Sequence, residues 1–185
     1  MAFIIKKREK ELPSEGLQNS VLVGLIDLGT SEDKMFGGIK RDALMVFEID
    51  ERNSDGKRHL VSGFYNQTMN PKSKLYKTIE TWQGRMPKAE AKEFNLETLL
   101  GKSASLNVQH TESGNAKICS ITPTAPNAEK LEPESEIFSF WLDDFPNNQE
   151  IFEGLSDFVK DRVKNSKEWQ EKQKDTPKEE ADVPF

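Results

Sequence analysis

The sequence contains few of the residues that stabilise small proteins through covalent or metal cross-links. Its 185 residues include one cysteine, Cys119, and two histidines, His59 and His110. One cysteine cannot form an internal disulfide, and these three residues cannot supply the four ligands of a structural zinc site. We therefore expect a packed core to provide the stability, and we expect neither a metal nor a cofactor.

Long apolar runs are also missing. The longest apolar stretch near the start, residues 21–26, is interrupted by Gly24, whereas a membrane-spanning helix needs about 18 consecutive apolar residues. Within the first ten residues the apolar side chains precede the charged ones, which is the reverse of a secretory signal. The sequence thus predicts no membrane association and a cytoplasmic location.

Sequence patterns typical of enzymes are absent as well. Gly37-Gly38 is followed by Ile39-Lys40-Arg41, so the Ser or Thr of a phosphate-binding loop does not follow the lysine. Acidic pairs such as Asp143-Asp144 lie in polar segments. We expect a protein without enzymatic activity.

Charge is distributed unevenly along the chain. The net charge is -6, but residues 126–185 hold 8 Lys or Arg against 16 Asp or Glu, a net of -8. Residues 1–125 hold 18 against 16, a net of +2. The overall acidity therefore belongs to the last third, and a nucleic-acid partner for the remainder is not excluded.

The apolar pattern predicts a mainly β fold. Short runs rich in branched and aromatic residues predict strands over residues 21–28, 43–49, 59–68, 103–111 and 116–122. Between the third and fourth strands, Asn70-Pro71 begins a predicted helix whose apolar stripe is Leu75, Ile79 and Trp82. This order of elements is that of the oligonucleotide-binding fold (OB-fold), a five-stranded Greek-key barrel.

The rest of the chain divides around this barrel. We expect an N-terminal arm over residues 1–19, the barrel over 20–125, and a linker with a packed helical extension over 126–166. The extension contains a predicted helix over residues 150–165 with an interruption at Gly154. Residues 167–185 have few apolar side chains and are predicted to form a disordered acidic tail.

A nucleic-acid surface needs cations for the phosphates and flat side chains for the bases. Candidates of both kinds gather around the predicted barrel, on the loop after the first strand, on the third strand and near the helix. They are Lys34, Phe36, Lys40, Arg41, Arg58, Phe64, Tyr65, Lys72, Lys74, Lys77 and Arg85. Because Phe64 and Tyr65 point to opposite sides of a strand, one of them belongs to the core.

The last residues form a second candidate site. The polar tail ends in Asp182-Val183-Pro184-Phe185, a peptide that can place its aromatic ring in an apolar pocket while its charges meet a basic rim. It resembles the acidic tip of bacterial single-stranded DNA-binding proteins, which typically ends in Asp-Asp-Ile-Pro-Phe, with Ala181-Asp182 in place of the acidic pair and Val183 in place of Ile. The resemblance implies a tail that recruits replication or recombination proteins.

The body of the chain also carries a resemblance. Its motifs are residues 44–48, 61–65, 73–75, 82–85 and 99–102 together with His110, and it covers about residues 15–165. These motifs are similar to those of bacteriophage replication proteins that bind single-stranded DNA. The resemblance implies stoichiometric protection of unpaired DNA during phage replication or recombination in the host cytoplasm.

Three questions stay open at this point. The barrel could bind a partner protein and never DNA, and it could prefer RNA. Open strand edges would also allow two copies to pair as a homodimer.

Overall fold

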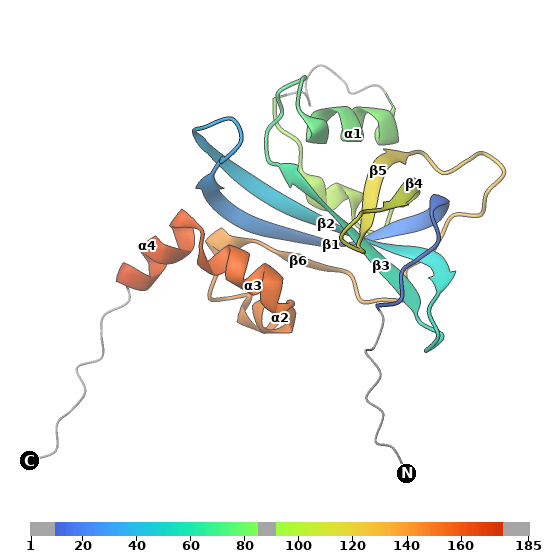
Figure 1. Ribbon diagram of the computed structural model, residues 1–185. Helices are drawn as coiled ribbons and strands as arrows, with labels where there is room; N and C mark the ends of the chain where they lie inside the picture. Colours follow the sequence, from blue (N-terminus) through green and yellow to red (C-terminus); the bar gives the residue numbers. More distant parts are fainter. Residues whose placement is uncertain (1–9, 85–91, 176–185) are drawn as a thin grey trace, which may run out of the picture.

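The computed structural model describes residues 10–84 and 92–175, which form one mainly β unit (Figure 1). Its strands are β1 (Gly16–Glu32), β2 (Ile39–Arg52), β3 (Arg58–Asn66), β4 (Ser103–His110), β5 (Ala116–Thr122) and β6 (Phe138–Phe140). They form a sheet in the order β3-β2-β1-β4-β5, in which β6 pairs with β1. All neighbouring pairs are antiparallel except β6 with β1. Within the described residues β3 and β5 contact each other but share no ladder, so the sheet is not closed.

The helix predicted between the third and fourth strands is present as α1 (Lys74–Gln83). It begins later than the Asn70-Pro71 pair indicates, because the Ser73 side chain caps the helix by accepting from the Tyr76 amide. Leu75, Ile79 and Trp82 are buried, as their spacing predicts. No helix within the described residues is long and apolar enough to cross a membrane.

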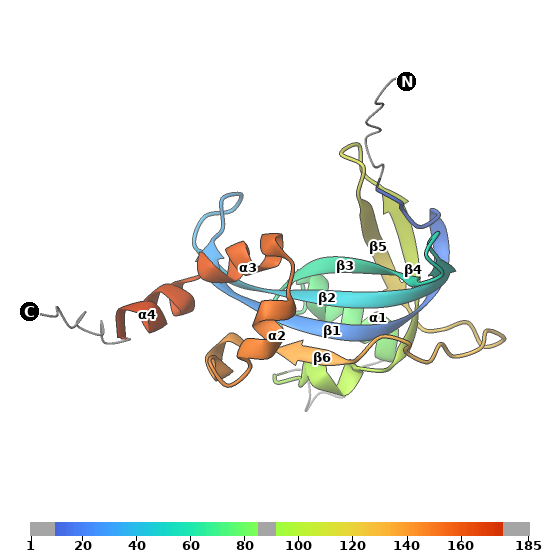
Figure 2. The ribbon, with the colours of Figure 1, turned by 90° about the horizontal axis from the view of Figure 1, so that it is seen from below.

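The long strands β1 and β2 are buried on both faces, which explains their nearly continuous apolar sequences. Leu22, Met45 and Phe47 belong to the core that α1, β4 and β5 complete. Val23 and Val46 belong to a second core, on the opposite face. Figures 1 and 2 show α1 on one side of these strands and the C-terminal helices on the other.

Strand β1 extends beyond its predicted range at both ends. At the start, Gly16 pairs with Val108 of β4, so the predicted N-terminal arm is wrong for residues 16–19. At the end, Glu32 pairs with Ile39 of β2. This second extension makes residues 30–41 a projecting hairpin, here called the hairpin tip (Figure 1). The predicted loop is present only over residues 33–38. Residues 30–32 and 39–40 are strand, because pairing between β1 and β2 outweighs their polar, glycine-rich composition.

The C-terminal extension forms the cover of the second core. After β6 and the 3-10 turn η2 (Leu142–Asp144) come α2 (Gln149–Gly154), α3 (Asp157–Lys164) and α4 (Lys167–Asp175). The break after Gly154 is as predicted. A second 3-10 turn, η1 (Leu96–Leu99), precedes β4.

The prediction of disorder from Lys167 onward is wrong for α4. Trp169 packs against Phe145 and Phe152, with ring centroids 4.6 and 4.8 Å apart respectively. Phe145 and Phe152 both precede α3 in the chain. The composition around Trp169 therefore gave no indication of these contacts. Residues 176–185 of the predicted tail lie outside the described residues.

Gly29 is the point where β1 meets the C-terminal helices. Its φ is 72°, and a Cβ there would lie 2.5 Å from the Ser166 Cβ and 2.7 Å from the Leu142 Cδ2. Substituting alanine therefore combines a left-handed backbone with overpacking, and we expect Gly29→Ala to lower the free energy of unfolding by about 2 to 3 kcal/mol.

Gly37→Ala is the matched control for this prediction. Its φ is 75°, but nothing lies within 4 Å of the added Cβ, so it should cost only the backbone strain of about 1 kcal/mol. Urea unfolding of both variants measures the difference. Equal losses would show that the helices do not pack on Gly29 as described.

Candidate nucleic-acid interface

The turn of the hairpin tip exposes an aromatic ring. The Asp33 Oδ1 accepts from the amides of Met35 and Phe36 at 3.0 and 3.2 Å, and these hydrogen bonds lower the pKa of Asp33. The Gly37 amide closes the turn by donating to the Asp33 carbonyl at 2.9 Å. With the backbone held in this way, the Phe36 side chain points outward and is 85% exposed. An exposed ring on a defined turn is available to stack on a base.

An open hollow lies between this hairpin tip and the loop formed by residues 66–73. We call it the tip–loop hollow, and its volume is about 790 Å³. It is lined by Phe36, Ile39, Lys40, Arg41, Asn66, Gln67, Thr68, Asn70, Lys72 and Ser73. Four of the predicted site residues, Phe36, Lys40, Arg41 and Lys72, are thus brought together from distant parts of the sequence.

The floor of the hollow is held by a cluster of charged and polar groups around Asp27. The Arg41 Nη2 lies 2.5 Å from the Asp27 Oδ2, and the Gln67 side-chain amide donates to the Asp27 Oδ1 at 2.7 Å. Arg41 also pairs with Asp143 at 3.0 Å. The hydrogen bond with Asp27 is the main cause of a raised Arg41 pKa.

Arg41 therefore has a structural role. Its guanidinium is engaged by three carboxylates, those of Asp27, Asp143 and Glu168. Lys40 pairs with Asp42 alone among the described residues, so Arg41 is less available than Lys40 to neutralise a phosphate. A DNA contact by Arg41 stays a prediction, and these ion pairs weaken it. Two of its partners, Asp27 and Asp143, belong to segments far apart in sequence, and no local pattern reveals them.

Arg58 is likewise engaged by a buried carboxylate. Its side chain is only 11% exposed and lies 3.0 Å from the buried Glu48 carboxylate. Burial alone would raise the pKa of Glu48, but hydrogen bonds from Ser135, Glu134 and Arg58 together lower it. This ion pair fixes the segment before β6 and lies away from the tip–loop hollow.

The two aromatic residues of β3 have different environments. Tyr65 is the core residue of the pair at 2% exposure, and burial raises its pKa to about 12. Phe64 is on the other face, where the Arg162 guanidinium lies 4.8 Å from its ring centroid and the Phe158 ring 6.3 Å. Helix α3 therefore packs against one side of Phe64, whose ring remains 40% exposed.

Lys74 and Lys77, two further predicted cations, do not line the tip–loop hollow. The Lys74 Nζ lies 4.4 Å from the Tyr65 ring centroid, and desolvation, followed by the Lys117 charge, lowers its pKa. Lys77 is exposed on α1 and does not line the hollow. Arg85 and the predicted tail site Asp182–Phe185 lie outside the described residues.

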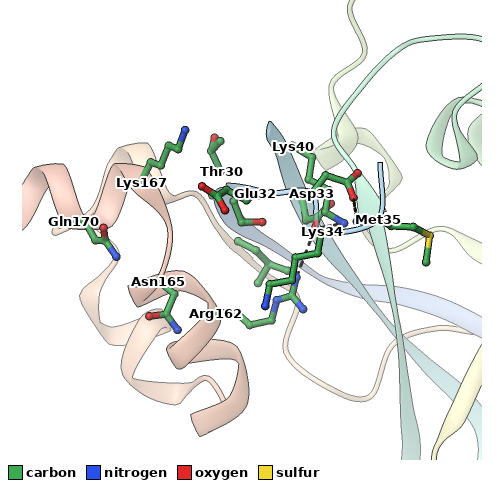
Figure 3. Close-up of a pocket in the computed structure, with 14 residues that line it drawn as sticks. Thr30, Glu32, Asp33, Lys34, Met35, Lys40, Arg162, Asn165, Lys167 and Gln170 are labelled. Atoms are coloured by element: carbon green, nitrogen blue, oxygen red, sulfur yellow. Dashed lines mark hydrogen bonds and ion pairs between the residues drawn. The ribbon is translucent and has the colours of Figure 1, made fainter. Parts of the chain in front are cut away.

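A second hollow lies on the other side of the hairpin tip. We call it the tip–helix cleft, and its volume is about 670 Å³. Lys34 and Lys40 contribute from the hairpin side, and Arg162, Asn165, Lys167 and Gln170 contribute from α3, the turn after it and α4 (Figure 3). The charged residues of 162–167 gave no signal in the sequence because that segment was assigned to a packed extension and a tail.

Comparison of the sequence with protein-family models gave no match, and comparison with curated proteins gave none either. The resemblance to phage and bacterial single-stranded DNA-binding proteins therefore rests on the motifs quoted above and stays a prediction.

Proposed function

We propose that this protein binds single-stranded DNA without sequence preference, through the tip–loop hollow. The observation that carries the proposal is the 85% exposed ring of Phe36 beside Lys40 and Lys72. An exposed ring can stack on any base, and the lysines can neutralise the adjacent phosphates. The amide side chains of Asn66 and Asn70 add hydrogen-bonding groups that either a base or a sugar can use.

The fold inference that accompanies this proposal is an OB-fold in partly open form. Its support is the strand order: β1 pairs with both β2 and β4, α1 lies between β3 and β4 in the chain, and β3 contacts β5. OB-folds bind oligonucleotides with the face of strands 2 and 3 and the adjoining loops. The tip–loop hollow lies at the start of β2 and the end of β3, between the loop that precedes β2 and the loop that follows β3.

The biological part of the proposal depends on the sequence resemblance. In this role the protein would protect unpaired strands during phage replication or recombination. It would recruit other proteins through Asp182–Phe185. A stoichiometric binder of this kind requires no catalytic group. Its mechanism is release of counterions from the phosphates together with base stacking.

The experiment that tests the proposal is a titration of labelled oligo-dT with the full chain at several salt concentrations. Contacts from Lys40 and Lys72 predict that log affinity falls with log salt with a slope of about -1.4. Absence of binding at about 50 mM salt would refute the proposal and favour a protein-interaction module. Competition by oligo-U of equal length measures the preference between DNA and RNA.

A further inference from the structure

We propose that the C-terminal helices α3 and α4 form part of the nucleic-acid site, and that the tip–helix cleft holds the phosphate backbone of the strand where it continues beyond the tip–loop hollow. This inference rests on the proposed function, because the strand must first occupy the tip–loop hollow. It goes beyond that function by assigning DNA contacts to the helical extension.

The two hollows are connected by a shared side chain. Lys40 lines both the tip–loop hollow and the tip–helix cleft. Between them stands the hairpin tip, where Met35 and Phe36 are exposed. A strand that stacks a base on Phe36 can therefore pass over the hairpin tip and keep its phosphates within reach of Lys40 on either side.

The cations of the cleft come from both of its walls. Figure 3 shows Lys34 from the hairpin tip and Arg162 from α3 extending into the space between them. Lys167 adds a third cation at the start of α4. Lys34 and Lys167 have no ion-pair partner within the part of the chain that the structure describes.

The acidic residues of the cleft are largely engaged already. Asp42 is nearly buried and is shared by Lys40 at 3.3 Å and Arg162 at 3.5 Å. Asp33 accepts hydrogen bonds from its own turn. Four cations against Glu32, Asp33 and Asp42 leave the lining with a net charge of +1, which favours a phosphate over a cationic ligand.

The side chains of the cleft also favour a polymer backbone over a base. Among the described residues, the lining includes the side-chain amides of Asn165 and Gln170 and the hydroxyl of Ser31, but no aromatic ring. Phosphate and sugar oxygens are the groups that such cations and donors bind in nucleic acids. The tip–loop hollow would thus bind a base and the tip–helix cleft its neighbouring phosphates.

The test compares the variant Arg162→Ala/Lys167→Ala with the matched control Lys160→Ala/Lys164→Ala. Both remove two positive charges from the C-terminal helices, but Lys160 and Lys164 do not line the cleft. Each protein is titrated with oligo-dT of about 5 and about 15 nucleotides, lengths that span the usual site sizes of OB-folds. Circular dichroism confirms that both variants are folded.

We expect the cleft variant to lose about tenfold affinity for the longer oligonucleotide and little for the shorter one. Its salt slope should become shallower by about 1.4, which is 0.7 for each of two phosphates on a single strand. The single variant Lys167→Glu changes only an exposed side chain, so its loss of affinity for the longer oligonucleotide cannot be attributed to unfolding.

Two other results are distinguishable. If the unaltered protein binds the oligonucleotides but the cleft variant and Lys167→Glu match the control, the assignment of the cleft is overturned while the proposed function stands. If the unaltered protein binds neither length, the proposed function fails and the inference fails with it.

Discussion

Asp27→Ala is expected to lower the free energy of unfolding by about 3 to 5 kcal/mol, the range for removal of one partner of a buried ion pair. Asp27 is 1% exposed. Its carboxylate accepts from Arg41 through Nε and Nη2, from Gln67, and from the amides of Gly29 and Leu142. Alanine would remove the Asp27 acceptor from all of these donors, although the Arg41 Nη2 keeps Asp143 and Gln67 keeps the Asp42 carbonyl. The half-buried Arg41 charge would lose its closest partner.

The loss is expected to be cooperative because Asp27 joins three parts of the molecule. Gly29 and Arg41 belong to the base of the hairpin tip, Gln67 to the loop of the tip–loop hollow, and Leu142 to the C-terminal extension. Urea unfolding measures the effect. Asp143→Ala is the control, since that carboxylate also pairs with Arg41 but its side chain is 70% exposed, and exposed pairs contribute about 1 kcal/mol or less. Similar losses for the two variants would contradict the central position given to Asp27.

The second large effect concerns DNA affinity. We expect the triple variant Lys34→Glu/Phe36→Ala/Lys72→Glu to weaken binding of oligo-dT by at least about 100-fold at low salt. Loss of one stacked base accounts for about 1 to 3 kcal/mol. Replacing two lysines by glutamate changes their attraction of phosphate to repulsion. It also removes the counterion release that these two lysines contribute to binding.

Stability should change little in this variant, because all three side chains are exposed. Surface substitutions of this kind usually alter the free energy of unfolding by about 0.5 kcal/mol or less. The matched control is Leu17→Ala/Lys57→Glu/Lys130→Glu, which makes the same charge change and removes one exposed apolar side chain away from both hollows. Equal affinity of the two triple variants would show that the hairpin tip does not contact DNA.

The fold was predictable where the signal is local. Runs of branched residues indicate the strands, the Leu75, Ile79 and Trp82 spacing indicates α1, and Gly154 marks a helix break. The ends of β1 and the helix α4 were not predictable, because their stability comes from partners distant in sequence. Trp169, for example, is an isolated aromatic residue until Phe145 and Phe152 are placed beside it.

The candidate site shows the same division. Phe36, Lys40 and Lys72 could be selected by residue type and position near predicted loops, and the structure brings them together. Arg41 and Arg58 are of the same residue type, yet buried carboxylates engage both of them. Sequence alone does not separate a cation that faces solvent from one that balances a buried acid. The contribution of Arg162 and Lys167 requires the position of α3 and α4 against the hairpin tip, which is a tertiary feature.

The most direct test of this account is a crystal structure of the protein with a short oligo-dT. We predict a base stacked on the Phe36 ring, with phosphates of the same strand within hydrogen-bonding distance of the Lys40 and Lys72 ammonium groups. A strand bound over the Leu60 and Phe64 surface of β3, with the hairpin tip unoccupied, would contradict the account.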